Sequence, residues 1–191
     1  NKLMKVLICN PELANENSNS VKFYIYSMGD LNYLDVSAIQ YNLDVFKDYF
    51  KNTGLLSNIS ANNQLINKIG LRYCKENDFK DCIVLNNSKV VSETLNGNVF
   101  AIIENKIFTP PLKDGCSNNV MRSKIIELIN NNIDGYTVLE ESLSVFDIQK
   151  SDELFVINID FGIKSVNSFR KKIFSSSITE IIKKRLNSLI V

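Results

Sequence analysis

The sequence contains no histidine, and this absence excludes several kinds of active site. Ser-His-Asp triads, Cys-His nucleophile pairs and histidine-ligated metals cannot be built within this chain. The seven glycines form neither a GxGxxG nor a GxxxxGKS/T motif, so the familiar phosphate-binding loops are absent as well. Enzymatic chemistry would therefore have to use carboxylates, lysine, tyrosine, cysteine, serine or an organic cofactor.

The chain also lacks an excess of either charge. Its 22 basic and 21 acidic residues give a net charge of +1, with no block of like charge. This balance argues against attraction to nucleic acid or to a membrane surface. No apolar run approaches the roughly 18 residues that span a bilayer, and the opening NKLMKVLIC lacks the small-residue cleavage site of a signal peptide. We therefore expect a cytoplasmic protein with no nucleic-acid or membrane partner.

The four cysteines show no CxxC spacing. That spacing is the usual sequence sign of a zinc site or of a redox motif, so neither is expected, and no metal site is assigned. We expect Cys9, Cys74, Cys82 and Cys116 to be buried or partly buried thiols in a reducing compartment.

The length and composition suit one large domain, or one domain with part of another. With 191 residues and 45% hydrophobic content, the chain can bury a sizeable core. A short opening helix or strand is followed by a polar loop over residues 12–20 and by three strand-like segments, at residues 21–27, 35–40 and 45–50. We expect a partial small N-terminal α/β domain over residues 1–52, a linker over residues 53–58 and a larger C-terminal domain over residues 59–191.

The larger region mixes helical and strand patterns. Apolar residues at helical spacing predict helices over residues 62–76, 119–132 and 175–191. Short apolar runs such as DCIVLNN predict the strands between them. A shorter helix is expected at SVFDIQK, with Ser144 as its N-cap residue. The pattern is that of an α+β fold without an internal repeat.

Three segments in order carry a distinctive set of motifs. They are DCIVLNNSKVVSETLNGNVFAIIENKIFTPPL, DGCSNNVMRSKIIELI and ESLSVFDIQKSDELFVINIDFGIKSV. Together they resemble the fold-type IV pyridoxal-phosphate (PLP) enzymes, which include class IV, D-amino-acid and branched-chain aminotransferases and aminodeoxychorismate lyase. The resemblance covers roughly residues 45–191. It implies the D-amino-acid aminotransferase-like fold, with PLP in a cleft between a small and a large domain.

The resemblance gives two residues of the Glu-x-x-x-Gly-Asn-Val-Phe element a place beside the cofactor ring. Glu93 matches the glutamate that pairs with the pyridine nitrogen of PLP and keeps the ring an electron sink. Asn98 matches an asparagine that shapes the same turn. Without the resemblance, Glu93 would be interpreted as a solvated acidic residue at a break between two strands.

The resemblance also implies a phosphate site, with departures. Val120 and Met121 match positions whose backbone N–H groups hold the phosphate at a helix N-terminus. Asn119 stands where the family usually has glycine, and asparagine tolerates unusual backbone angles better than most residues. Ile159 falls where the family often has a threonine whose hydroxyl binds phosphate. Residues 1–50 resemble only the second half of the small domain, so the phosphate-binding arginine of its first half has no counterpart.

The segment SNISANNQLINKIG aligns with the family segment that carries the Schiff-base lysine, and Ser60 occupies the lysine position. A serine hydroxyl cannot form an imine with PLP. The alternatives for Ser60 are a helix-start residue that caps an N–H, a replacement that leaves the cofactor non-covalently bound, or a residual catalytic role. Among the nearby lysines, Lys68 lies inside the following helix, and neither Lys51 nor Lys164 matches the motif.

Two functions follow from the resemblance. The first is a PLP-dependent enzyme acting on a small molecule, aminodeoxychorismate lyase rather than an aminotransferase, with chemistry impaired by Ser60. The alternative is a non-catalytic homologue that acts as a structural or regulatory subunit. Because family members are usually dimers, the resemblance implies a homodimer or a heterodimer with an active paralogue.

Overall fold

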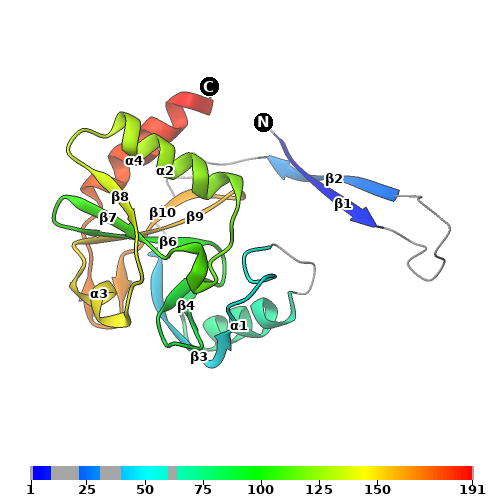
Figure 1. The fold of residues 1–191 in the computed structure, drawn as a ribbon. Coiled ribbons are helices and arrows are strands. Elements are labelled where there is room, and N and C mark those ends of the chain that lie inside the picture. Colours follow the sequence, from blue (N-terminus) through cyan, green and yellow to red (C-terminus); the bar gives the residue numbers. More distant parts are fainter. Residues whose placement is uncertain (1, 10–21, 31–39, 60–63, 191) are drawn as a thin grey trace. The chain divides into compact units, whose positions relative to one another are not determined.

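The structure is a computed structural model that describes residues 2–9, 22–30, 40–59 and 64–190. Its contacts divide the chain into two units, residues 1–35 and 36–191. The first unit is an antiparallel hairpin of β1 (Lys2–Cys9) and β2 (Lys22–Asp30) (Figure 1). The opening segment is therefore a strand, where the sequence left helix or strand open. The predicted loop 12–20 lies outside the described residues, as does nearly all of the predicted strand 35–40.

The second unit contains two five-stranded sheets and the helices that cover them. The first sheet has the order β10 (Gly162–Ser165), β9 (Glu153–Asn158), β6 (Asn98–Ile103), β7 (Lys106–Thr109), β8 (Thr137–Glu140). The second has the order β12 (Lys172–Ile173), β11 (Ser168–Phe169), β3 (Asn42–Lys51), β4 (Asp81–Asn86), β5 (Val91–Thr94). The helices are α1 (Leu65–Glu76), α2 (Val120–Asn132), α3 (Val145–Lys150) and α4 (Ser177–Ile190), with a 3-10 turn η1 (Leu112–Asp114).

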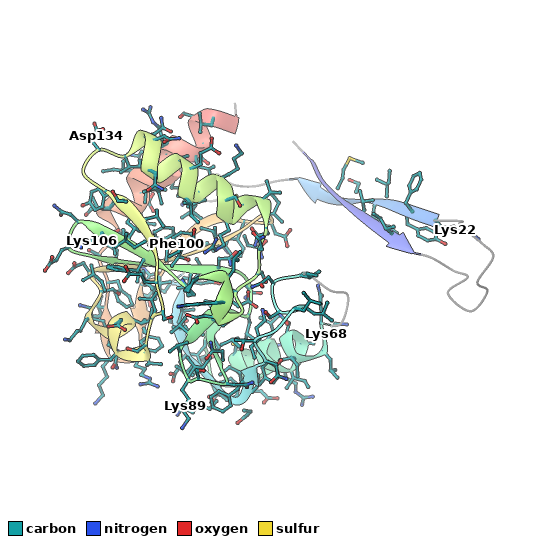
Figure 2. The ribbon with its side chains drawn as sticks, in the orientation of Figure 1. Lys22, Lys68, Lys89, Phe100, Lys106 and Asp134 are labelled. Carbon is teal, nitrogen blue, oxygen red and sulfur yellow. The ribbon has the colours of Figure 1, made fainter. Side chains whose placement is uncertain are left out.

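The two sheets pack face to face, and helices cover their outer faces (Figure 1). Alternate residues of a strand point to opposite faces. On β6, Val99 faces the other sheet, whereas Phe100 faces α2 and α4 and stacks on Phe155 with ring centroids 5.0 Å apart (Figure 2). On β4, Ile83 faces the inter-sheet core and Val84 faces α1. Burial on both faces explains why the central residues CIVL of this strand are continuously apolar rather than alternating.

β3 lies before the expected domain boundary at residue 52, and its strand partners β4 and β11 lie after it. β3 pairs in parallel with β4, where Leu43 lies opposite Asp81 and Val45 opposite Ile83. It also pairs in parallel with β11. These contacts place β3 in the unit 36–191. The sequence did not indicate this pairing, because parallel partners are distant along the chain and leave no local pattern.

Two local expectations are confirmed, the N-cap of α3 and the burial of three cysteines. Ser144 is the N-cap residue of α3 and forms a reciprocal capping box with Asp147. Cys74, Cys82 and Cys116 are free and buried, as expected, whereas the structure describes only the backbone of Cys9. Within the described part of the chain, no helix is long and apolar enough to cross a membrane. The short strands β10, β11 and β12 were not predicted from the sequence.

Candidate functional site

A cavity of about 350 Å³ opens beside the end of β3 and the start of α1. Its polar lining includes Lys51, Glu93 and Ser117, together with the amide side chains of Asn52, Gln64 and Asn67. Apolar side chains from β4, α1 and the segment before α1 complete the wall. All of the lining residues belong to the unit 36–191.

Lys51 and Glu93 form an ion pair in this cavity. The Lys51 Nζ atom lies 2.5 Å from Glu93 Oε1, and the two side chains are only 17% and 15% exposed. The backbone N–H of Ser117 donates to Glu93 Oε2 at 2.8 Å. Glu93 is thus a mostly buried residue of β5, and the interpretation of its local sequence as a solvated turn is wrong.

Strand register explains how residues so distant in sequence meet. In the second sheet β4 lies between β3 and β5, with Lys51 opposite Asn86 and Glu93 opposite Val84. Asn86 and Val84 are two residues apart on β4, so their neighbours project from the same face of the sheet. That face is the one covered by α1.

The turn that follows β5 is held against the end of β9. A Cβ atom at Gly97 would lie 2.0 Å from the carbonyl oxygen of Ile157, so only glycine allows this approach. The side chain of Asn158 also donates a hydrogen bond to the carbonyl of Asn96. Ile159 follows directly, with its side chain 52% exposed and no hydroxyl to offer.

Asn98 connects this turn to the start of α2. It is buried, and its Nδ2 group donates to the carbonyl of Ser117 at 2.9 Å. Its Oδ1 atom accepts from Asn119 Nδ2 at 2.7 Å. Because the same Ser117 donates its N–H to Glu93, the carboxylate, the turn and the helix start form one hydrogen-bonded assembly.

Asn119 is the N-cap residue of α2. Its Oδ1 atom accepts from the backbone N–H of Arg122 at 2.9 Å, and its φ is −135°. This extended conformation is open to any residue, so capping, rather than tolerance of an unusual angle, explains the asparagine. Val120 and Met121 begin the helix, where backbone N–H groups lack intrahelical acceptors.

Ser60, the residue at the predicted lysine position, lies outside the described residues. The segment just before it is anchored, because Asn58 Nδ2 donates to the carbonyls of Leu112 and Cys116 at 2.7 Å each. Ile59 lines the cavity. The N-cap position of α1 is held by Gln64, four residues after Ser60, without a side-chain capping bond.

Among the lysines that the structure describes, Lys51 is the one that lines the cavity. Lys68 projects from the exposed side of α1 (Figure 2). The ammonium of Lys164 lies 4.7 Å from the centroid of the Phe161 ring, away from the cavity lining. In the sequence Lys51 was noted only as a lysine that does not match the motif, and no nearby residue indicated its pairing with Glu93.

Cys82 and Cys116 are poor nucleophiles. Burial raises the pKa of the Cys116 thiol to about 11, and this thiol donates to the carbonyl of Pro110. The hydrogen bond with Cys74 and burial raise the pKa of Cys82. Because the thiolate is the reactive form, neither thiol is activated for chemistry. None of the described cysteines lines this cavity, whose charged lining residues are Lys51 and Glu93.

Comparison with known proteins first defines the class of fold. The structure is similar to that of the branched-chain amino acid aminotransferase from Thermobaculum terrenum, determined in its PLP form. The TM-score is 0.83 at 16% identity, over 98% of this chain and 64% of that chain. This is the α+β fold that the motifs predicted.

The sequence then defines the family. Residues 29–169 match the family described as amino-transferase class IV, and the chain belongs to it. It is 28% identical over 113 residues to aminodeoxychorismate lyase from Vibrio harveyi, covering 59% of this chain and 41% of that protein. It is 30% identical over 100 residues to branched-chain amino acid aminotransferase 1 from Humulus lupulus, covering 51% and 25%. The matches span less than half the length of these relatives.

Proposed function

We propose that this chain is a class IV aminotransferase homologue whose own cleft does not carry out PLP-dependent catalysis. The observation that carries the proposal is the Lys51–Glu93 ion pair, with 2.5 Å between Nζ and Oε1. The carboxylate that would pair with the cofactor ring already has a cationic partner. Ser60 supports the same conclusion, because imine formation needs an amine.

The residues of this cleft are not suited to binding PLP in the way that the family resemblance implies. Both oxygens of Glu93 accept hydrogen bonds from the chain itself, one from Lys51 and one from Ser117. Ile159 has no hydroxyl for a phosphate, and Asn119 uses its side chain to cap α2. The backbone N–H groups at the start of α2 keep the chemistry expected of a phosphate site. We therefore assign no catalytic step to these residues.

The test is a covalent trap on the purified full chain. The protein is incubated with excess PLP, reduced with borohydride and mapped by peptide mass spectrometry. We expect no lysine adduct in the wild type. Ser60→Lys should restore an adduct at position 60, whereas Ser142→Lys, on an exposed residue outside the cavity lining, should not. A stoichiometric adduct on any lysine of the wild type would contradict the proposal.

The second candidate is a working PLP-dependent enzyme. It is favoured by one observation, that Glu93 is retained, mostly buried and directed into a cavity of about 350 Å³. Within this candidate we favour a lyase that forms p-aminobenzoate and pyruvate from aminodeoxychorismate, in keeping with the Vibrio relative. Release of pyruvate from that substrate by the purified chain would support it over amino-group transfer.

If the cleft is inactive, we propose that the chain serves as a structural or regulatory subunit. The family resemblance supports a homodimer or a heterodimer with an active paralogue. Light scattering on the purified chain, alone and mixed with such a paralogue, tests this, and a monomer under both conditions would contradict it.

A further inference from the structure

We infer that Lys51 determines which ligands the cavity accepts, because its ammonium excludes a positively charged ring nitrogen from the carboxylate of Glu93. The inference rests on the proposed function in one respect: the ligand is held without a lysine imine. It goes further by assigning a selective role to a residue outside the family motif.

The pairing is a product of the sheet. Lys51 is the last residue of β3 and Glu93 lies within β5, and each is fixed by its backbone register with β4. Their side chains project from the same face of the sheet toward α1. The Ser117 N–H then holds the second carboxylate oxygen at 2.8 Å. The carboxylate is therefore oriented before any ligand arrives.

The charges make this arrangement selective. At 17% and 15% exposure, neither side chain has much access to water, so each charge is compensated mainly by the other. A ring cation that takes the place of Lys51 would leave the ammonium in the same cavity as the incoming positive charge. A neutral or anionic ring avoids this conflict and can use the amide side chains of Asn52, Gln64 and Asn67.

The experiment compares two ring probes, PLP and its 1-deaza analogue, in which carbon replaces the ring nitrogen. Equilibrium dialysis of the full chain measures the non-covalent dissociation constant of each. Lys51→Met should bind PLP at least about tenfold more tightly than the wild type, a gain of about 1.4 kcal/mol. The same variant should show no gain for the deaza analogue, which has no ring nitrogen to meet Glu93.

Three further variants isolate the charge. Lys51→Arg keeps a cation beside Glu93 and should bind PLP as weakly as the wild type. Lys51→Met combined with Glu93→Gln should lose the gain. This double variant also leaves no unpaired buried charge, so its folding shows whether instability of the single variant distorts the comparison. Lys164→Met, which removes a lysine outside the cavity lining, is the matched control and should behave like the wild type.

Equal affinity of Lys51→Met and wild type for PLP would overturn the inference. An equal gain for both probes would overturn it too, since extra space rather than charge would then explain the result. Borohydride trapping separates this failure from failure of the proposed function. A wild-type imine at a lysine other than Lys51 contradicts only the proposed function, whereas an imine at Lys51 contradicts both.

Discussion

Replacing Asp81 by asparagine should abolish a large pH dependence of stability. Asp81 begins β4, and its side chain is fully buried. Burial raises its pKa from 3.8 to about 6, and this outweighs the opposing effect of the Tyr41 hydroxyl, which donates to Oδ2 at 2.9 Å. The backbone N–H of Cys82 also donates to this carboxylate, at 2.8 Å from Oδ1.

The magnitude follows from the two pKa values. Each factor of ten in proton affinity is worth about 1.4 kcal/mol, so the difference corresponds to about 3 kcal/mol. The folded state binds the proton more tightly than the unfolded state. The contribution to stability is therefore fully present below pH 3.8 and is lost as the pH rises through about 6.

The assay is urea unfolding of wild type and Asp81→Asn at several pH values from 4 to 7.5. The free energy of unfolding of the wild type, relative to the variant, should fall by about 2–3 kcal/mol over this range. Other titrating groups cancel in the difference. Asp134→Asn, on an exposed aspartate, serves as the control (Figure 2). A wild-type-to-variant difference that stays constant with pH would refute the reasoning.

Two further substitutions test the local geometry. Gly97→Ala should lower the free energy of unfolding by about 2 kcal/mol or more, because the new Cβ atom would lie 2.0 Å from a backbone carbonyl oxygen. Gly54→Ala is the control, because a Cβ atom at Gly54 would have no atom within 4 Å. Equal stability of the two variants would contradict the contact at Gly97. Ser144→Ala should lower the free energy of unfolding by about 1 kcal/mol, because the N-cap of α3 is lost. Ser142→Ala, the control, should leave it nearly unchanged. Thermal melts that show no difference between the two variants would contradict the capping box.

Structural features that depend on residues close together in the chain could be predicted from the sequence. The Ser144 cap depends on a partner three residues away, and the buried strand β4 is indicated by the apolar run CIVL at its centre. By contrast, β11 and β12 have two residues each, too few to set up a period. The membership of β3 depends on parallel pairing with strands far along the chain.

In the candidate site, too, the residues of a local motif could be predicted, whereas a pair distant in sequence could not. The motif around Glu93 and Asn98 indicated a turn near a cofactor cleft, and the structure joins both residues to Ser117. The Lys51–Glu93 pair spans 42 positions and exists only because β4 lies between their strands. The residues around Lys51 or Glu93 in the sequence do not indicate the other member of the pair. The pair could be predicted only from the order of the strands in the sheet.

The contacts that fix the turn at Gly97 do not depend on the reactive groups of the cleft. The turn is fixed by main-chain contact with β9 and by amide hydrogen bonds of Asn98 and Asn158, none of which involves an ionisable side chain. Exchange of the reactive groups at positions 51 and 60 therefore leaves these contacts intact. Over evolution the chemistry of such a cleft can change while selection maintains its shape, and a protein engineer can introduce an amine without rebuilding the surrounding contacts.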